Sequence, residues 1–119
     1  MKLENKRITI EINDNTYELP ERTVAVEEAI KKHDELIPER NEYENNKEMI
    51  EILIGKKAFK EIFPKGDKEN LDNIAMVAFA CLEAYYKPKT DAENARAKAA
   101  LDRIQALQNK ANHPANKRK

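Results

Sequence analysis

The chain has 119 residues, with 22 basic and 22 acidic side chains and a formal net charge of zero. This length suits one domain, and the balanced charge argues against a broad nucleic-acid-binding surface, which needs a basic excess. A single cysteine excludes an internal disulfide, two glycines exclude glycine-rich phosphate loops, and the lack of serine removes most hydroxyl-nucleophile chemistry.

The charge is unevenly distributed along the chain. Residues 1–63 hold 11 basic and 15 acidic groups, whereas residues 64–119 hold 11 basic and 7 acidic groups. Such an asymmetry either favours head-to-tail self-association or has no consequence. The opening MKLENKRITI lacks the apolar run of a signal peptide, and the longest uncharged run, residues 73–82, is too short to span a bilayer. We therefore expect a soluble cytoplasmic protein.

The first predicted element is a β-hairpin over about residues 7–19. Ile8, Ile10 and Ile12 alternate with polar residues, and an Asn-Asp-Asn turn follows. A two-residue loop at residues 14–15 would pair Ile12 with Tyr17 and Ile10 with Leu19, which keeps all four on one face. A three-residue loop would split the apolar set, so we predict the shorter loop.

Helical patterns follow the hairpin. Thr23 can cap a helix that runs to about Leu36, with its inner face at Val26, Ala29, Ile30 and His33. Pro38 suits the first turn of a second helix, which becomes apolar over residues 49–54 and ends near Gly55. A short helix over residues 56–63 comes next, and Pro64-Lys65-Gly66-Asp67 marks a clear break.

The stretch NLDNIAMVAFACLEAYY, residues 70–86, predicts a helix that is apolar on every side. Such a helix must be covered all round, either by the rest of the chain or by another molecule. We expect one face to be the core of the fold; its members are Leu71, Ile74, Ala78, Phe79 and Leu82. The reverse face is the candidate partner-binding surface, and the candidate residues are Met76, Val77, Ala80, Ala84 and Tyr86. Tyr86 is included because exposed tyrosines favour interfaces; alternatively, Tyr85 and Tyr86 close the end of the core.

The C-terminal part predicts one more helix. Pro88 should end the apolar helix, and Thr90 with Glu93 forms a capping box for the last one. Its thin, mostly small apolar stripe comprises Ala97, Ala100, Leu101, Ile104, Leu107 and Ala111. Residues 112–119 are polar and basic, and we expect a disordered tail there. The predicted fold is α+β, mostly α: a short hairpin and about four to five helices in one domain over residues 1–111.

Catalytic and metal-binding patterns are weak in this sequence. The acidic residues between 27 and 44 alternate with basic ones on helix faces, which is typical of a solvated surface. His33 has no second histidine or cysteine at ligand spacing, and Cys81 sits among apolar neighbours with no histidine nearby. We predict a non-enzymatic protein with no cofactor, no metal and no nucleic-acid partner.

Two parts of the chain carry a family resemblance: the hairpin ITIEINDNTYEL and the stretch EILIGKKAFKEIFPKGDKENLDNIAMVAFACLEAYY. An Ile-Gly step precedes a helix with Phe59 and Phe63, a Pro/Gly/Asp loop follows, and a long apolar helix comes last. This order resembles the tail assembly chaperones of long-tailed phages and prophages of Gram-positive bacteria. The resembling elements cover roughly two thirds of the chain.

The resemblance implies a specific function. Such chaperones are thought to coat the tape measure protein in the host cytoplasm, to bring tail tube subunits to it, and to be absent from the mature virion. The resemblance also implies homo-oligomers and no catalytic residues. The alternative is another small phage or bacterial interaction protein, such as a head–tail connector component or a regulatory module.

Overall fold

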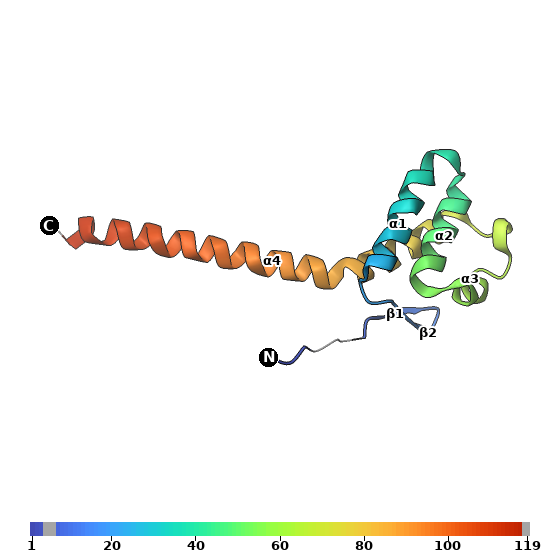
Figure 1. Ribbon diagram of the computed structural model, residues 1–119, viewed down its shortest axis with the longest axis horizontal. Coiled ribbons are helices and arrows are strands. Elements are labelled where there is room, and N and C mark those ends of the chain that lie inside the picture. Colours follow the sequence, from blue (N-terminus) through green and yellow to red (C-terminus); the bar gives the residue numbers. More distant parts are fainter. Residues whose placement is uncertain (4–6, 118–119) are drawn as a thin grey trace. The chain divides into compact units, whose positions relative to one another are not determined.

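The structure is a computed structural model that describes residues 1–3 and 7–117, with side-chain surroundings given as far as Lys110. An antiparallel hairpin precedes four helices in chain order, as Figure 1 shows. The elements are β1 (Thr9–Ile12), β2 (Asn15–Glu18), α1 (Val24–Leu36), α2 (Glu42–Ile54), α3 (Lys56–Ile62) and α4 (Leu71–Lys117), with short 3₁₀ turns at Ile37–Glu39 and Gly66–Lys68. The predicted mostly helical α+β fold with an N-terminal hairpin is confirmed.

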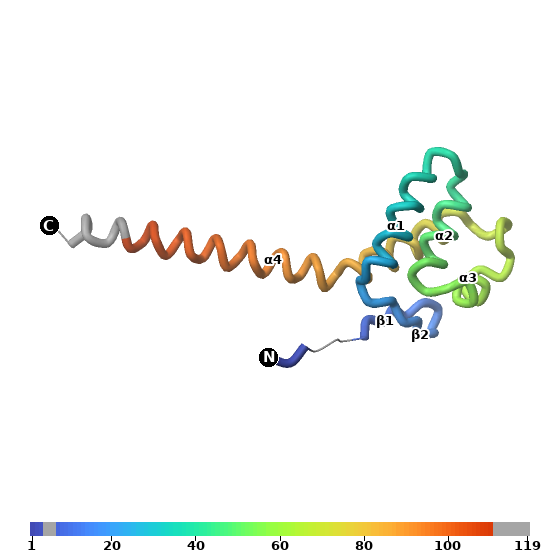
Figure 2. Tube along the Cα trace, in the orientation of Figure 1, coloured from blue at the N-terminus to red at the C-terminus, as the bar shows by residue number. Residues whose placement is uncertain are grey.

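The chain divides into two compact units, Met1–Tyr86 and Lys87–Lys119. The first unit contains the hairpin, α1, α2, α3 and the start of α4, and Figure 2 traces the Cα course through these elements. The second unit continues α4. The sequence predicts a single domain over residues 1–111. The end of that domain at residue 111 stays a prediction.

The hairpin has the predicted apolar face but a different register. Ile10 pairs with Tyr17, and the amide of Leu19 donates to the carbonyl of Ile8 at 2.8 Å. The predicted pairing of Ile10 with Leu19 is therefore wrong by two residues. The loop residues are Asn13 and Asp14, both at positive φ (51° and 65°), as a type I′ turn requires. A shift of two residues keeps the same side chains on the same face, so the apolar pattern alone does not distinguish the two registers.

One hydrophobic cluster forms the core of the first unit. The hairpin contributes Leu19, and its isoleucines pack against the cluster as partly buried residues. The Tyr17 hydroxyl also donates to Glu61 of α3 at 3.3 Å. The fully or nearly fully buried apolar members are Leu19, Ile30, Met49, Ile50, Leu53, Phe59, Phe63, Ile74, Ala78, Cys81 and Tyr85. All of them lie before Lys87.

Side-chain caps begin the first two helices. Thr23 caps α1 as predicted, since its Oγ1 accepts from the amide of Val26 at 3.3 Å. The second helix begins later than expected: Pro38 lies in a separate 3₁₀ turn, and Asn41 caps α2 by accepting from the amide of Glu44 at 2.8 Å. An asparagine side chain offers the acceptor that a helix start needs, which explains the later boundary.

Gly55 joins α2 directly to α3. Its backbone, at φ 96° and ψ 159°, ends one helix and begins the next. This conformation is open essentially only to glycine. The sharp turn directs Phe59 of α3 back into the core, where its ring meets the rings of Tyr43 and Phe63 at centroid distances of 6.3 and 5.5 Å.

The fourth helix runs through Pro88 instead of ending before it. Proline removes one helical hydrogen bond and costs about 3 kcal/mol in a helix interior. The residues beyond it are rich in alanine, which has the highest helix propensity, and Lys87–Asp91 at 3.4 Å and Lys89–Glu93 at 3.8 Å add pairs four residues apart. Thr90 is thus inside the helix, and its predicted capping role is wrong. The helix includes residues 112–117 of the predicted tail, and residues 118–119 lie outside the described part.

Candidate interaction surface

The first part of α4 has a clearly defined inner face. Ile74, Ala78, Cys81 and Tyr85 are each 4% exposed or less. Their spacing of four, three and four residues places them along one side of the helix. They join the core cluster together with residues from α1, α2 and α3. This side of α4 is therefore occupied by the fold itself.

The opposite side of the same segment is exposed and apolar at its centre. Met76 and Phe79 are both 67% exposed. Asp72 and Glu83 are exposed too, and they follow the same four-three-four spacing, so the four residues form one outward row with an acid at each end. We call Asp72, Met76, Phe79 and Glu83 the outer row. Each residue of the outer row lies two positions before a residue of the buried row, which corresponds to a rotation of about 200° around the helix axis.

The structure corrects part of the predicted inner face. Phe79 and Leu71 were expected in the core, but both are exposed. Ile74 and Ala78 are buried as predicted, and Leu82 is partly buried. Cys81 and Tyr85 are buried as well. The sequence prediction placed Cys81 on neither face of the helix, and it left open whether Tyr85 closes the end of the core. In a helix that is apolar on every side, periodicity fixes the spacing of a face but not which face is turned inward.

The predicted partner-binding residues have different surroundings. Met76 belongs to the outer row, whereas Val77, Ala84 and Tyr86 are partly buried against the core, and Ala80 is partly buried. Of these five, only Met76 combines a large apolar side chain with high exposure. Phe79, which helical spacing predicts in the core, adds a second large, exposed apolar side chain. The assignment of all five residues to a partner stays a prediction.

A second exposed apolar surface lies on the later part of α4. Leu101, Ile104 and Leu107 are 59%, 51% and 67% exposed. They are the large members of the stripe predicted from the sequence; Ala111 of that stripe lies outside the residues whose side chains are described. We call Leu101, Ile104 and Leu107 the C-terminal stripe. Leucine and isoleucine three residues apart on an exposed helix face are unusual without a partner.

Basic side chains border this stripe on one side. Arg96, Arg103 and Lys110 recur every seven residues, so they share one edge of the helix. Within the described part of the chain, no ion pair engages any of the three. The C-terminal stripe thus has a positive edge, in contrast to the acidic ends of the outer row.

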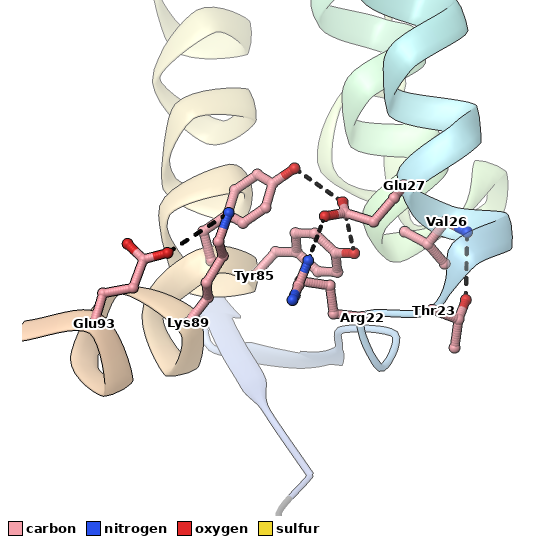
Figure 3. A network of polar contacts seen from close by, with 8 residues as sticks. Arg22, Thr23, Val26, Glu27, Tyr85, Lys89 and Glu93 are labelled. Atoms are coloured by element: carbon pink, nitrogen blue, oxygen red, sulfur yellow. Dashed lines mark hydrogen bonds and ion pairs between the residues drawn. The ribbon is translucent and has the colours of Figure 1, made fainter. Parts of the chain in front are cut away.

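Glu27 of α1 organises a polar cluster at the end of the core. Its carboxylate accepts from Arg22 at 2.8 Å, from the Tyr85 hydroxyl at 3.2 Å and from the Tyr86 hydroxyl at 2.9 Å. Figure 3 shows the Arg22 and Tyr85 side chains pointing at it. The hydrogen bond from Arg22 is the main reason that the pKa of Glu27 is lowered, and burial raises the pKa of Tyr85 well above its usual value. Three donors on one carboxylate fix the end of the buried row to α1.

A second polar cluster links α1 to α2. His33 is buried, and its Nδ1 lies 2.8 Å from Oε1 of Glu48, whose Oε2 is 2.6 Å from Arg40. Burial opposes ionisation of Glu48, but the hydrogen bonds from Arg40 and His33, with their charge interactions, lower its pKa. The predicted solvated acidic surface is wrong for Glu27, and Glu48 lies outside the residues assigned to that surface. Arg22 is five residues from Glu27, but the two tyrosines are 58 and 59 residues away and His33 is 15 residues from Glu48, so local spacing does not signal these clusters.

The remaining candidates for chemistry have structural surroundings. Cys81 is fully buried, and burial raises the pKa of its thiol to about 11, which disfavours the reactive thiolate. Among the residues whose side chains the structure describes, 1–3 and 7–110, no group of three or more could hold a metal ion. The described helices include none that is both long and apolar enough to cross a membrane.

Comparisons with family models, with curated proteins and with solved structures found no match to this chain.

Proposed function

We propose that this chain is a non-enzymatic tail assembly chaperone of a long-tailed phage or prophage, which binds the tape measure protein and helps recruit tail tube subunits. The resemblance of the hairpin and of residues 50–86 to that family supports the proposal. The observation that carries it is the outer row of α4, where Met76 and Phe79 are each 67% exposed on a helix whose other side is packed in the core.

The physical basis is the recognition of an amphipathic helix. A long protein that is prone to aggregate exposes apolar helix faces before assembly, and a rigid apolar surface with polar edges can cover them. The buried row, with Ile74 and Cys81 at 0% exposure, holds α4 in place. The outer row is thus presented with little conformational freedom to lose on binding, which favours affinity. The chaperone would act in the host cytoplasm and leave before the virion is complete.

Gene order gives a first test of this function: the gene should lie between the tail tube and tape measure genes.

Co-expression tests the function directly. The tape measure protein should be recovered in the soluble fraction only when this chain is co-expressed. Met76→Glu places a charge in the middle of the outer row, so we expect it to abolish co-purification.

Asn109→Glu is the matched control, because it adds the same charge at an exposed position away from both apolar surfaces. Circular dichroism should show that both variants keep the fold. If the wild-type chain neither binds nor keeps the tape measure protein soluble, the chaperone proposal fails. Binding to a head–tail connector or to a regulator in the same assay would support the alternative function instead.

A further inference from the structure

The C-terminal stripe and its basic edge repeat with the period of a coiled coil. Arg96, Arg103 and Lys110 recur every seven residues, and Ile104 and Leu107 lie one and four positions after Arg103. In heptad notation the three cations occupy g positions, Ile104 an a position and Leu107 a d position. Residues at a and d form the seam between two coiled helices, and residues at g flank it. The stripe therefore has the layout of one strand of a coiled coil.

The seam contains small side chains as well as large ones. One heptad earlier, Ala97 and Ala100 occupy the a and d positions, and Leu101 follows at e. All residues from 87 to 110 are exposed, so the seam is open to a second helix. Close packing of two helices sets small side chains of one against large side chains of the other. A fitting partner thus carries large apolar side chains opposite Ala97 and Ala100.

The cations of the basic edge have almost no acid within reach on their own helix. Ion pairs along an α-helix join residues three or four positions apart. At these distances from Arg103 and Lys110 the chain has only alanine, leucine, histidine and proline. The one acid at such a distance from Arg96 is Glu93, which pairs with Lys89 at 3.8 Å. The charge of this edge is therefore available to an acidic partner.

We propose that the C-terminal stripe binds an amphipathic helix of another protein whose edge is acidic, and that the two helices form a short coiled coil. The partner helix has apolar residues at its a and d positions. Along the edge that faces Arg96, Arg103 and Lys110 it has Asp or Glu every seven residues. Charge complementarity identifies this chemistry, because a row of cations repels a basic edge and attracts an acidic one. The inference does not rest on the chaperone function, which uses the outer row.

The same charges disfavour the pairing of two C-terminal stripes. In an antiparallel pair, the g positions of one helix face those of the other, so cation would meet cation. In a parallel pair, g faces e, and the e residues here are Asn94, Leu101 and Gln108, none of which is acidic. Charges at e and g set partner choice in coiled coils. The stripe thus finds no charge partner in a copy of itself.

A helix also fits the stripe better than an anionic membrane surface does. Helices that lie on membranes place basic residues across the polar face and aromatic residues or leucine on the apolar face. Here the cations are concentrated on one edge, whereas the other edge has the amides Asn94 and Gln105 and a single cation, Lys98. Residues 87–110 contain no aromatic side chain. A one-sided row of charge is suited to one neighbouring helix.

Binding of a synthetic helix to the full chain tests the proposal. The probe is a fluorescent four-heptad peptide with leucine or isoleucine at a and d and glutamate at e and g, whose like charges oppose self-pairing. Fluorescence anisotropy at physiological ionic strength should give a dissociation constant in the micromolar range. Ile104→Glu should abolish this binding, whereas Phe79→Glu in the outer row should change the dissociation constant by about twofold or less.

No binding to the wild-type chain, or equal losses in the Ile104→Glu and Phe79→Glu variants, would overturn the proposal. The tape measure assay depends on the outer row and this assay on the C-terminal stripe, so the two proposals fail separately. Circular dichroism on each variant should show the helix content of the wild type.

Charge reversal tests whether the basic edge selects the partner. Arg103→Glu should weaken binding of the acidic peptide by about tenfold or more, because glutamate then faces glutamate. Lys98→Glu makes the same change of charge at an exposed position on the other edge, so it should alter the dissociation constant by about twofold or less. Equal weakening by the two variants would show a response to net charge alone and contradict the proposed contact.

Vesicles separate a helix partner from a membrane. Phosphatidylcholine vesicles that contain phosphatidylglycerol should leave the wild-type chain in the supernatant after centrifugation. Sedimentation of the chain with these vesicles, lost in the Ile104→Glu variant, would assign the stripe to a membrane surface and overturn the proposal.

Discussion

Two residues only five positions apart on α4 have opposite surroundings. Ile74 is fully buried, whereas Phe79 is 67% exposed. We expect Ile74→Ala to lower the free energy of unfolding by about 2–5 kcal/mol, because it leaves a cavity in the core. Phe79→Ala removes a larger side chain, but it should change the free energy of unfolding of the monomer by about 0.5 kcal/mol or less, because Phe79 is exposed. Urea denaturation followed by circular dichroism, under conditions where the protein is monomeric, measures both, and similar losses would contradict the assigned faces.

Glu48 makes stability depend on pH. In the folded state the pKa of Glu48 lies below its ordinary value of 4.5, so the ionised carboxylate stabilises the fold. This contribution is fully present above pH 4.5, and it is lost as the pH falls through the lower, folded-state pKa. Glu48→Gln removes this contribution. We expect the thermal midpoint of the variant to lie below that of the wild type at pH 7.

The pH series itself gives the control. The difference between the Glu48→Gln variant and the wild type should narrow as the pH falls well below 4.5, since both then lack the charge. Glu44→Gln, at an exposed position on the same helix, should match the wild type throughout. A Glu48→Gln difference that stays constant down to pH 3 would show that the ion pairs with His33 and Arg40 are not its source.

The sequence predicted the burial of some individual residues correctly and that of others wrongly. His33 and Ile30 were correctly placed on the inner face of α1, because polar residues separate its apolar positions. The prediction for Phe79 was wrong because no charged residue lies between Asn73 and Glu83, so periodicity alone did not show which side faces outward. Asp72 and Glu83, at the two ends of its row, were the signal that could have placed it. The role of Glu27 could not be found because its tyrosine partners lie 58 and 59 residues away, and that of Glu48 because His33 lies on another helix, 15 residues away.

The hairpin is the element whose contribution is easiest to measure. Ile10 is partly buried against the core and pairs with Tyr17, whereas Thr9 points to the exposed side. Ile10→Asp should cost about 1–3 kcal/mol of stability, because it places a charge against apolar side chains. Thr9→Asp should cost less than half of that. Thermal unfolding compares the two, and equal shifts in the midpoint would mean that the hairpin does not dock through this face.

Elements were predicted more reliably than their ends. The hairpin and the first three helices follow from periodicity and caps, and their boundaries differ by a few residues. The register of the hairpin was wrong because two loops, at residues 13–14 and at residues 14–15, bury the same face. The continuity of α4 was missed because Pro88 is a strong local signal for a helix end. The helix propensity of the 29 residues that follow it in α4, residues 89–117, outweighs that signal.

At the scale of the molecule, the core lies entirely before Lys87. A chain that ends after Tyr86 retains the whole hydrophobic cluster, the Glu27 cluster and the His33–Glu48 pair. We expect this truncated chain to unfold cooperatively with a midpoint within about 5 °C of that of the full chain, which corresponds to a difference of about 1 kcal/mol or less. Differential scanning calorimetry on both proteins, at a concentration where the full chain is monomeric, makes the comparison. Loss of the cooperative transition would show that residues 87–119 are needed for the fold.

Exposure of Met76 and Phe79 on a single side of α4 has a consequence for the proposed function. The two side chains are three residues apart, so one amphipathic helix can cover both at once. Such a helix would bind the folded chain and not the unfolded one, because the outer row is formed only when the other side of α4 is packed in the core. By mass action, a bound segment of the tape measure protein should therefore raise the thermal midpoint of this chain, and more so as the concentration of the segment rises.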